Sequence, residues 1–136
     1  MLLVEGDGDA VHAFAQEIRR FHPFAPFIGG PGAAGLRWAG EDSPASGLYG
    51  QNHDPQLFPQ PYAFDPRRFR LHEPGRDELV PQGGGDAATN HRCPGEDVTL
   101  TVLETLVPRL AALRYDVPAQ DLRIPLSPPH AAAASS

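Results

Sequence analysis

The chain contains no lysine, because all 11 of its basic residues are arginine. This absence excludes Schiff-base catalysis, and it excludes a phosphate-binding loop whose lysine contacts a nucleotide. The formal charge of -6 at pH 7 argues against a nucleic-acid partner, since such proteins present a basic patch to the phosphate backbone. We therefore expect a protein that binds no nucleic acid.

Cysteine and long apolar runs are scarce as well. Cys93 is the only cysteine, so the chain cannot form an internal disulfide and gives no sign of an oxidising compartment. The apolar residues 1–4 are too few for a signal peptide, and no segment approaches the roughly 20 apolar residues of a membrane-spanning helix. The sequence predicts a cytoplasmic protein that does not enter a membrane.

Glycine and proline are abundant instead, with 14 and 16 residues among 136. This composition predicts many loops, although the chain is long enough for one domain and has enough apolar residues for a core. We expect a marginally stable folded part over residues 1–126. Residues 127–136 contain mostly proline, alanine and serine without a pattern, and this tail is predicted to be disordered.

Two helices are predicted, with only weak strands between them, so the fold class is mainly α with minor β. The first helix begins at Asp9 as its N-cap, runs to about Phe21, and ends because of Pro23. Weak strands are expected within residues 24–28 and 36–38. One face of the first helix carries apolar residues at helical spacing, namely Val11, Phe14, Ala15 and Ile18.

The second helix is predicted to follow Pro94, with two acidic residues in its first turn. Pro108 lies inside the pattern and predicts a kink or a break there. The apolar residues that define its 3.6-residue period are Val98, Val102, Leu103, Leu106, Leu110 and Leu113.

Cys93 lies in the segment 91–96, HRCPGE, shortly after the glycine-rich segment 82–86, QGGGD. A glycine-rich loop lets backbone N–H groups turn toward one sulfur, and the dipole of the following helix also favours a thiolate. A lone thiolate suits the axial position of haem iron and lacks the further ligands of a zinc site. Two alternatives stay open. Cys93 is a small buried hydrophobe, or it is a nucleophile paired with His91, although side chains two residues apart do not converge.

The order of three motifs resembles the C-terminal third of the haem-thiolate cytochrome P-450 superfamily. These motifs are Glu17-x-x-Arg20 on the first helix, the segment 64–69 (FDPRRF), and the cysteine loop. Within the superfamily the chain is most similar to the bacterial fatty-acid peroxygenases. This finer resemblance is carried by residues 20–24 (RFHPF), 49–54 (YGQNHD), 82–86 (QGGGD) and 90–96 (NHRCPGE).

The resemblance implies roles for individual residues. Cys93 is implied to be the axial ligand of haem b, with His91 or Arg92 near a haem propionate. Glu17, Arg20 and Arg68 are implied to form a structural triad, in which a carboxylate between two guanidinium groups joins the helix to the loop. His53 has no histidine at ligand spacing, and we interpret it as a hydrogen-bonding loop residue.

The activity implied by the resemblance is haem-dependent oxygenation, with hydrogen peroxide as the oxidant and a fatty acid as the substrate. No distal residue of such a site is visible, so no catalytic residue is assigned and a truncated fold is expected. The stretch 29–48 is short, Leu79 replaces an expected phenylalanine, and a closing hairpin is missing from Pro125 onward. The alternative is a non-catalytic remnant that folds partially and binds haem weakly or not at all.

Overall fold

A computed structural model describes residues 7–24, 47–90 and 92–121. Within these ranges the chain forms helices and no strand, apart from an isolated bridge between Pro81 and Gly83. The prediction of a mainly α fold is therefore confirmed, while the two weak strands and the tail 127–136 lie outside the described residues, except for Phe24. The helices are α1 (Gly8–Phe21), α2 (Gly47–Asn52), α3 (Arg68–Leu71) and α4 (Glu96–Ala111).

The ends of α1 follow from local capping. Asp7 is the N-cap, and its Oδ1 accepts a hydrogen bond from the Ala10 amide at 2.9 Å. The prediction of Asp9 as the cap was wrong by two residues, since Asp9 lies in the first turn, where its charge still suits the helix dipole. The predicted end at Phe21 is confirmed. The amide of His22 bonds to the Ile18 carbonyl, and Pro23 follows.

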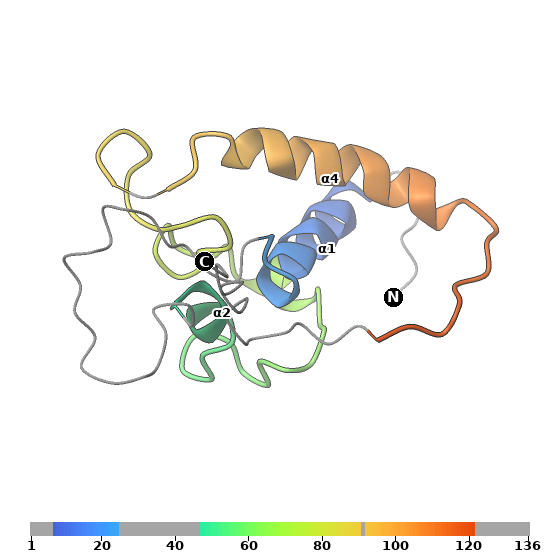
Figure 1. The fold of residues 1–136 in the computed structure, drawn as a ribbon, viewed down its shortest axis with the longest axis horizontal. Helices are drawn as coiled ribbons and strands as arrows, with labels where there is room; N and C mark the ends of the chain where they lie inside the picture. Colours follow the sequence, from blue (N-terminus) through green and yellow to red (C-terminus); the bar gives the residue numbers. More distant parts are fainter. Residues whose placement is uncertain (1–6, 25–46, 91, 122–136) are drawn as a thin grey trace, which may run out of the picture.

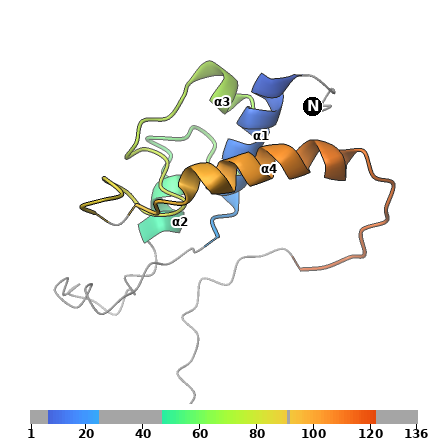
Figure 2. The ribbon, with the colours of Figure 1, turned by 90° about the horizontal axis from the view of Figure 1, so that it is seen from above.

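Helix α1 is the centre of the fold, because it contacts α2, α3 and α4 (Figures 1 and 2). Of the four residues on its predicted apolar face, only Ala15 is fully buried, while the other three are half-buried. Surrounding elements bury more of the helix than one apolar stripe predicts, and its buried polar side chains are held by ion pairs and hydrogen bonds. The buried residues of α1 are Ala10, Ala13, Ala15, Gln16, Glu17, Arg19 and Arg20.

A small apolar core lies against α1. It contains Ala13 of α1, Phe69 of α3, and Phe58 and Leu79 from the loops on either side of α3. The Phe58 and Phe69 rings have centroids 6.2 Å apart. Since Ala13 has a small side chain, the aromatic rings can approach the helix closely. Four buried residues give this part of the chain little apolar stabilisation, so the polar contacts described below matter for stability.

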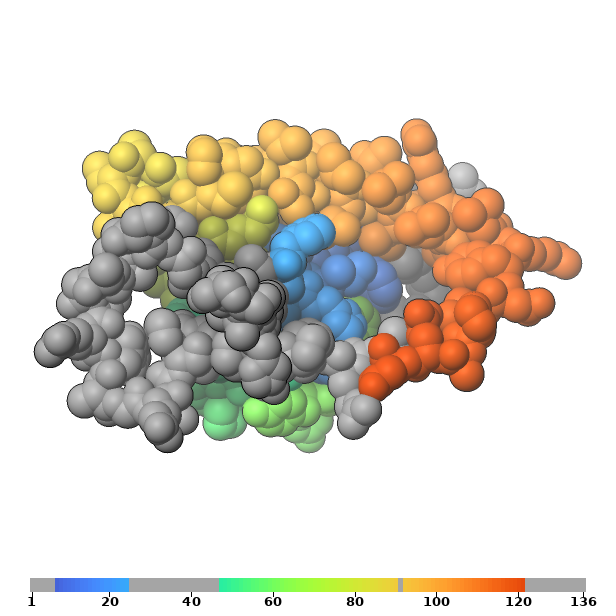
Figure 3. Space-filling model, in the orientation of Figure 1, coloured from blue at the N-terminus to red at the C-terminus, as the bar shows by residue number. Residues whose placement is uncertain are grey.

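Helix α4 lies across α1 and forms one long edge of the molecule (Figures 2 and 3). The helix continues through Pro108 to Ala111, so the expected break is wrong. Pro108 lies in the last turn, where the missing N–H removes one hydrogen bond, and the Ala112 amide still bonds to the Pro108 carbonyl at 3.1 Å. Val107 is buried, whereas much of the predicted apolar stripe is exposed, including Val98 at 67%. No helix in the described ranges has the length and apolarity to cross a bilayer.

Candidate functional site

A residue of α2 holds the segment that leads to Cys93 by a hydrogen bond. Asn52 is fully buried, and its Oδ1 accepts a hydrogen bond from the Val80 amide at 3.1 Å. Leu79 and Val80 are buried, and the chain then turns through the glycine run. The Cys93 amide donates to the Gln82 carbonyl at 3.1 Å, which closes the loop. The backbone of Cys93 is thus held next to Gln82, which follows the buried residues Leu79 and Val80.

The glycine run supplies backbone conformations that other residues adopt with difficulty. Gly83 and Gly85 have φ values of 99° and 80°, and a Cβ at Gly85 would lie 2.7 Å from the Cβ of Asn90. The expectation that glycine amides point at the sulfur was wrong for these two residues. The Gly83 amide bonds to the Val80 carbonyl, and the Gly85 amide bonds to Asp77 Oδ1 at 2.9 Å. Gly83 and Gly85 therefore shape the loop, and their amides bond to groups other than the thiol.

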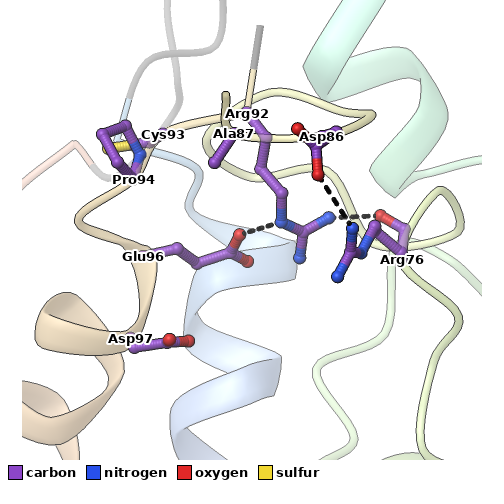
Figure 4. Close-up of a pocket in the computed structure, with 8 residues that line it drawn as sticks. All are labelled: Arg76, Asp86, Ala87, Arg92, Cys93, Pro94, Glu96 and Asp97. Atoms are coloured by element: carbon purple, nitrogen blue, oxygen red, sulfur yellow. Dashed lines mark hydrogen bonds and ion pairs between the residues drawn. The ribbon is translucent and has the colours of Figure 1, made fainter. Parts of the chain in front are cut away.

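Cys93 itself is half-exposed and free of any disulfide. Helix α4 begins three residues later, and the Glu96 amide bonds to the Cys93 carbonyl, so the predicted positive end of a helix dipole does lie beside the cysteine. A Cβ at Gly95 would lie 3.7 Å from the sulfur. Figure 4 shows the sulfur on the side of the loop away from the Arg92 guanidinium. His91, the proposed propionate contact and the alternative nucleophile partner, lies outside the described residues.

The three predicted triad residues come together in the interior. Glu17 and Arg20 are fully buried, and they form two parallel hydrogen bonds, from Arg20 Nε to Glu17 Oε2 at 2.7 Å and from Arg20 Nη2 to Oε1 at 2.8 Å. Arg68 Nε lies 3.3 Å from Glu17 Oε2, and the Asp65 amide donates to Oε1 at 2.7 Å. One carboxylate therefore joins α1 to the start of α3 and to the loop before it.

The two guanidinium groups of this triad also hold loop carbonyls. Arg20 donates to the carbonyls of Asn52 and Pro61, both at 2.8 Å, and to that of Ala63 at 3.3 Å. Arg68 donates to the carbonyls of Pro59 and Ala63 at 2.9 and 3.2 Å. These contacts fasten the proline-rich segment 52–63 to α1. They explain how a segment without sequence periodicity holds a defined path.

A second cluster of one carboxylate and two arginines was not predicted from the sequence. Glu96 at the start of α4 pairs with Arg19 of α1 and with Arg92 of the cysteine loop, whose Nε lies 2.7 Å from Glu96 Oε2. Arg92 Nη1 also donates to the Arg76 carbonyl at 2.5 Å. From the sequence, Arg92 is expected only to contact haem, and Glu96 is expected only to interact with the helix dipole. The partner of Glu96 on α1 is 77 residues away, so local spacing carries no signal for the pair.

A cavity of about 240 Å³ lies beside the cysteine loop (Figure 4). Its lining is mainly charged, and it includes the ion pair between Arg76 and Asp86 at 3.5 Å. A larger cavity, of about 630 Å³, lies around the triad arginine Arg68 and does not include Cys93. Across the described ranges no three His, Cys, Asp or Glu side chains gather to hold a metal ion. The charged cavity residues are Arg76, Asp86, Arg92, Glu96 and Asp97.

His53 is buried just after α2, and its Nδ1 lies 2.9 Å from the Tyr49 carbonyl, to which it donates. This contact agrees with its interpretation as a hydrogen-bonding residue. The ring stacks on Tyr49 with centroids 3.9 Å apart. Burial lowers the pKa of His53 below its ordinary value of 6.5, because the charged imidazolium would lose its hydration.

We predict that His53 makes the fold less stable in mild acid. The pKa of His53 is lower in the folded chain, so the unfolded chain binds more protons as the pH falls below about 6.5. The free energy of unfolding therefore decreases with falling pH until the pH reaches the folded pKa. Urea unfolding at pH 7.5 and pH 5 measures this loss. His53→Gln should reduce the difference between the two pH values, whereas the exposed His22→Gln should retain it. An equal pH dependence in both variants would contradict the prediction.

Known proteins resemble this chain in sequence and in fold. No family model matches the chain. Cytochrome P450 4e5, mitochondrial, of Drosophila mettleri is 29% identical over 113 residues, which are 79% of this chain and 21% of that protein. Cyclooctat-9-en-7-ol 5-monooxygenase of Streptomyces melanosporofaciens is 38% identical over 64 residues, 45% of this chain and 13% of that protein.

Solved structures agree. Cytochrome P450 OleT, in complex with arachidonic acid, is 37% identical with a TM-score of 0.67, and the match covers 89% of this chain and 30% of that chain. Cytochrome P450SP alpha (CYP152B1) is 34% identical with a TM-score of 0.66, covering 89% and 31%. In sequence and in fold, the chain matches the cytochrome P450 superfamily. The resemblance predicted from the motifs is thereby confirmed. This P450-like chain spans about a fifth of the length of the first curated relative and 30% of the first solved one.

Proposed function

We propose that the chain supplies the proximal side of a haem-thiolate oxidoreductase site, with Cys93 as the axial ligand of haem b iron. The observation that carries the proposal is the placement of Cys93: a half-exposed free thiol, on a loop fixed by its own backbone, next to the N-terminus of α4. Similarity to cytochrome P450s over most of the chain supports the same assignment.

Cys93 and its surroundings suit the binding of haem in three respects. The donor is single, as haem iron requires on one face. The sulfur is turned away from the Arg92 guanidinium, so a macrocycle bound to it need not displace that side chain (Figure 4). Gly95, next to the sulfur, presents no side chain there. Once bound, haem would supply oxygen activation, and the thiolate would favour O–O cleavage.

The proposed reaction is peroxygenase-type hydroxylation of a fatty acid, with hydrogen peroxide as the oxidant. Two similar solved proteins support a carboxylic-acid substrate, since OleT is in complex with arachidonic acid and P450SP alpha with (R)-ibuprofen. The part of this chain in that reaction is to hold the thiolate. The triad around Glu17 holds the segment 52–68 on α1, and Asn52 at the end of α2 bonds to the Val80 amide, in the segment that leads to the cysteine loop.

A carbon monoxide difference spectrum of the haem-reconstituted, reduced chain tests the ligand. We expect the red-shifted Soret band of thiolate ligation in the wild type and its complete loss in Cys93→Ala, because the only thiolate has been removed. Cys93→His is the matched control, since it should still bind haem and give the spectrum of a nitrogen ligand. Identical spectra for the wild type and Cys93→Ala would refute the assignment. Fatty-acid hydroxylation with added peroxide then tests the reaction separately.

A further inference from the structure

The cluster around Glu96 lies beside the cysteine loop, in the lining of the same cavity as Cys93, and its members are mostly buried. Glu96 is 9% exposed, the Arg19 side chain is 2% exposed, and the Arg92 side chain is 20% exposed. Charges this deeply buried are kept only when they are paired, because an unpaired one loses its hydration without compensation. The cluster is therefore a built contact between α1, α4 and the loop, and it differs from a surface ion pair.

Arg19 gives Glu96 a rigid anchor. Its Nη2 bonds to Glu96 Oε1, and its Nη1 donates to Gln16 Oε1 at 2.6 Å, so both ends of the guanidinium are held. The next residue, Arg20, is fixed within the Glu17 triad. Consecutive arginines of α1 thus hold the segment before α3 through one carboxylate and the start of α4 through another. The cysteine loop ends at the second of these points.

Arg92 is the charged residue nearest in sequence to Cys93. Its Nε pairs with Glu96 at 2.7 Å, and its Nη1 donates to the Arg76 carbonyl, so the guanidinium is turned away from the sulfur (Figure 4). A guanidinium released from these contacts would be free to approach the thiolate. It would then stabilise the negative charge on sulfur and reduce electron donation from sulfur to iron.

We propose that Glu96 is a positioning residue for Cys93: it holds the loop against α1 and keeps the Arg92 charge away from the thiolate. The inference rests on the proposed function only in its second part, because holding the loop does not require haem. It gives Glu96 a role beyond that of an acidic residue in the first turn of a helix. Asp97 provides the comparison, since it lies on the same turn, has the same charge and is exposed.

Hydrogen exchange on the full chain without haem tests the first part. The reporters are the amides of Glu96 and Thr99, which bond to the carbonyls of Cys93 and Gly95. Glu96→Gln keeps the size of the side chain and removes its charge, and we expect exchange to become at least about tenfold faster, because a partly buried pair loses one partner. Asp97→Asn should change the rates less than about twofold. Equal effects of the two substitutions would overturn the proposal.

The reduction potential of the haem-loaded chain tests the second part. Glu96→Gln should raise the Fe(III)/Fe(II) potential, since it leaves Arg92 uncompensated, and Arg92→Gln should lower it. The double variant should return close to the wild-type potential, which a purely structural role would not produce. A double variant that stays at the Glu96→Gln potential would contradict the inference.

The two experiments separate this inference from the proposed function. If the wild type shows no thiolate spectrum, the haem assignment fails, while hydrogen exchange still decides whether Glu96 holds the loop. If Glu96→Gln fails to fold by circular dichroism, Arg92→Gln replaces it in the exchange experiment, because Arg92 is more exposed and Arg19 still pairs with Glu96. Unchanged exchange at Glu96 and Thr99 in Arg92→Gln would then refute the role of the cluster in holding the loop.

Discussion

Replacing Arg20 with leucine should abolish cooperative folding of the chain. Arg20 is fully buried and donates two hydrogen bonds to Glu17 and three to loop carbonyls. The substitution leaves the Glu17 carboxylate buried with Arg68 as its remaining charged partner, and breaking a buried pair in this way costs about 3–5 kcal/mol. The whole free energy of unfolding of a domain is about 5–15 kcal/mol, and the small core puts this chain toward the low end.

Urea unfolding followed by circular dichroism measures the effect. Arg20→Lys should also lose most of the stability, because an ammonium group cannot make the paired hydrogen bonds to Glu17 and reach the carbonyls together. Arg67→Lys is the matched control. Its side chain is 75% exposed and pairs with Asp65 at 2.8 Å, so we expect little change in the free energy of unfolding. An Arg20→Leu variant as stable as Arg67→Lys would show that the triad does not hold the fold.

The sequence predicted the helices well and their surroundings poorly. Periodicity and Pro23 placed α1 and its end, because these signals are local. The predicted N-cap was Asp9, whereas the structure has Asp7 in this position. Two acidic residues two positions apart look equally suitable as caps in the sequence. The apolar period of α4 predicted a helix, yet Val98 and its neighbours along the stripe are exposed. Periodicity reports that a helix forms, but it does not report which elements are present to cover it.

The site shows the same division between local and distant information. The resemblance to a known family brought Glu17, Arg20 and Arg68 together, although residues 17 and 68 are far apart in sequence. No such signal existed for Arg19 and Glu96. The glycine run predicted amides turned toward the sulfur, but the Gly85 N–H bonds to Asp77, a partner that the glycines themselves do not indicate.

Replacing Phe69 with alanine should destabilise the fold nearly as much as losing Arg20. Phe69 is 6% exposed and packs on Phe58 in the buried apolar cluster that these two residues form with Ala13 and Leu79. Removing a buried phenylalanine side chain typically costs about 3–5 kcal/mol, and a core this small has few other side chains to fill the cavity. Leu71→Ala is the matched control on the same short helix. Leu71 is 88% exposed, so its substitution should change the free energy of unfolding by less than about 0.5 kcal/mol.

The two large effects should not be additive. The Arg20 guanidinium carbon lies 5.4 Å from the centroid of the Phe58 ring, and the same ring packs on Phe69. The aromatic core therefore forms one wall of the space that buries the triad, and loss of Phe69 lets water approach the Glu17 carboxylate. Where Arg20→Lys and Phe69→Ala are each partly folded, a double-mutant cycle from urea unfolding should give a coupling of about 0.5–3 kcal/mol. A coupling near zero would mean that the core and the triad stabilise the chain independently.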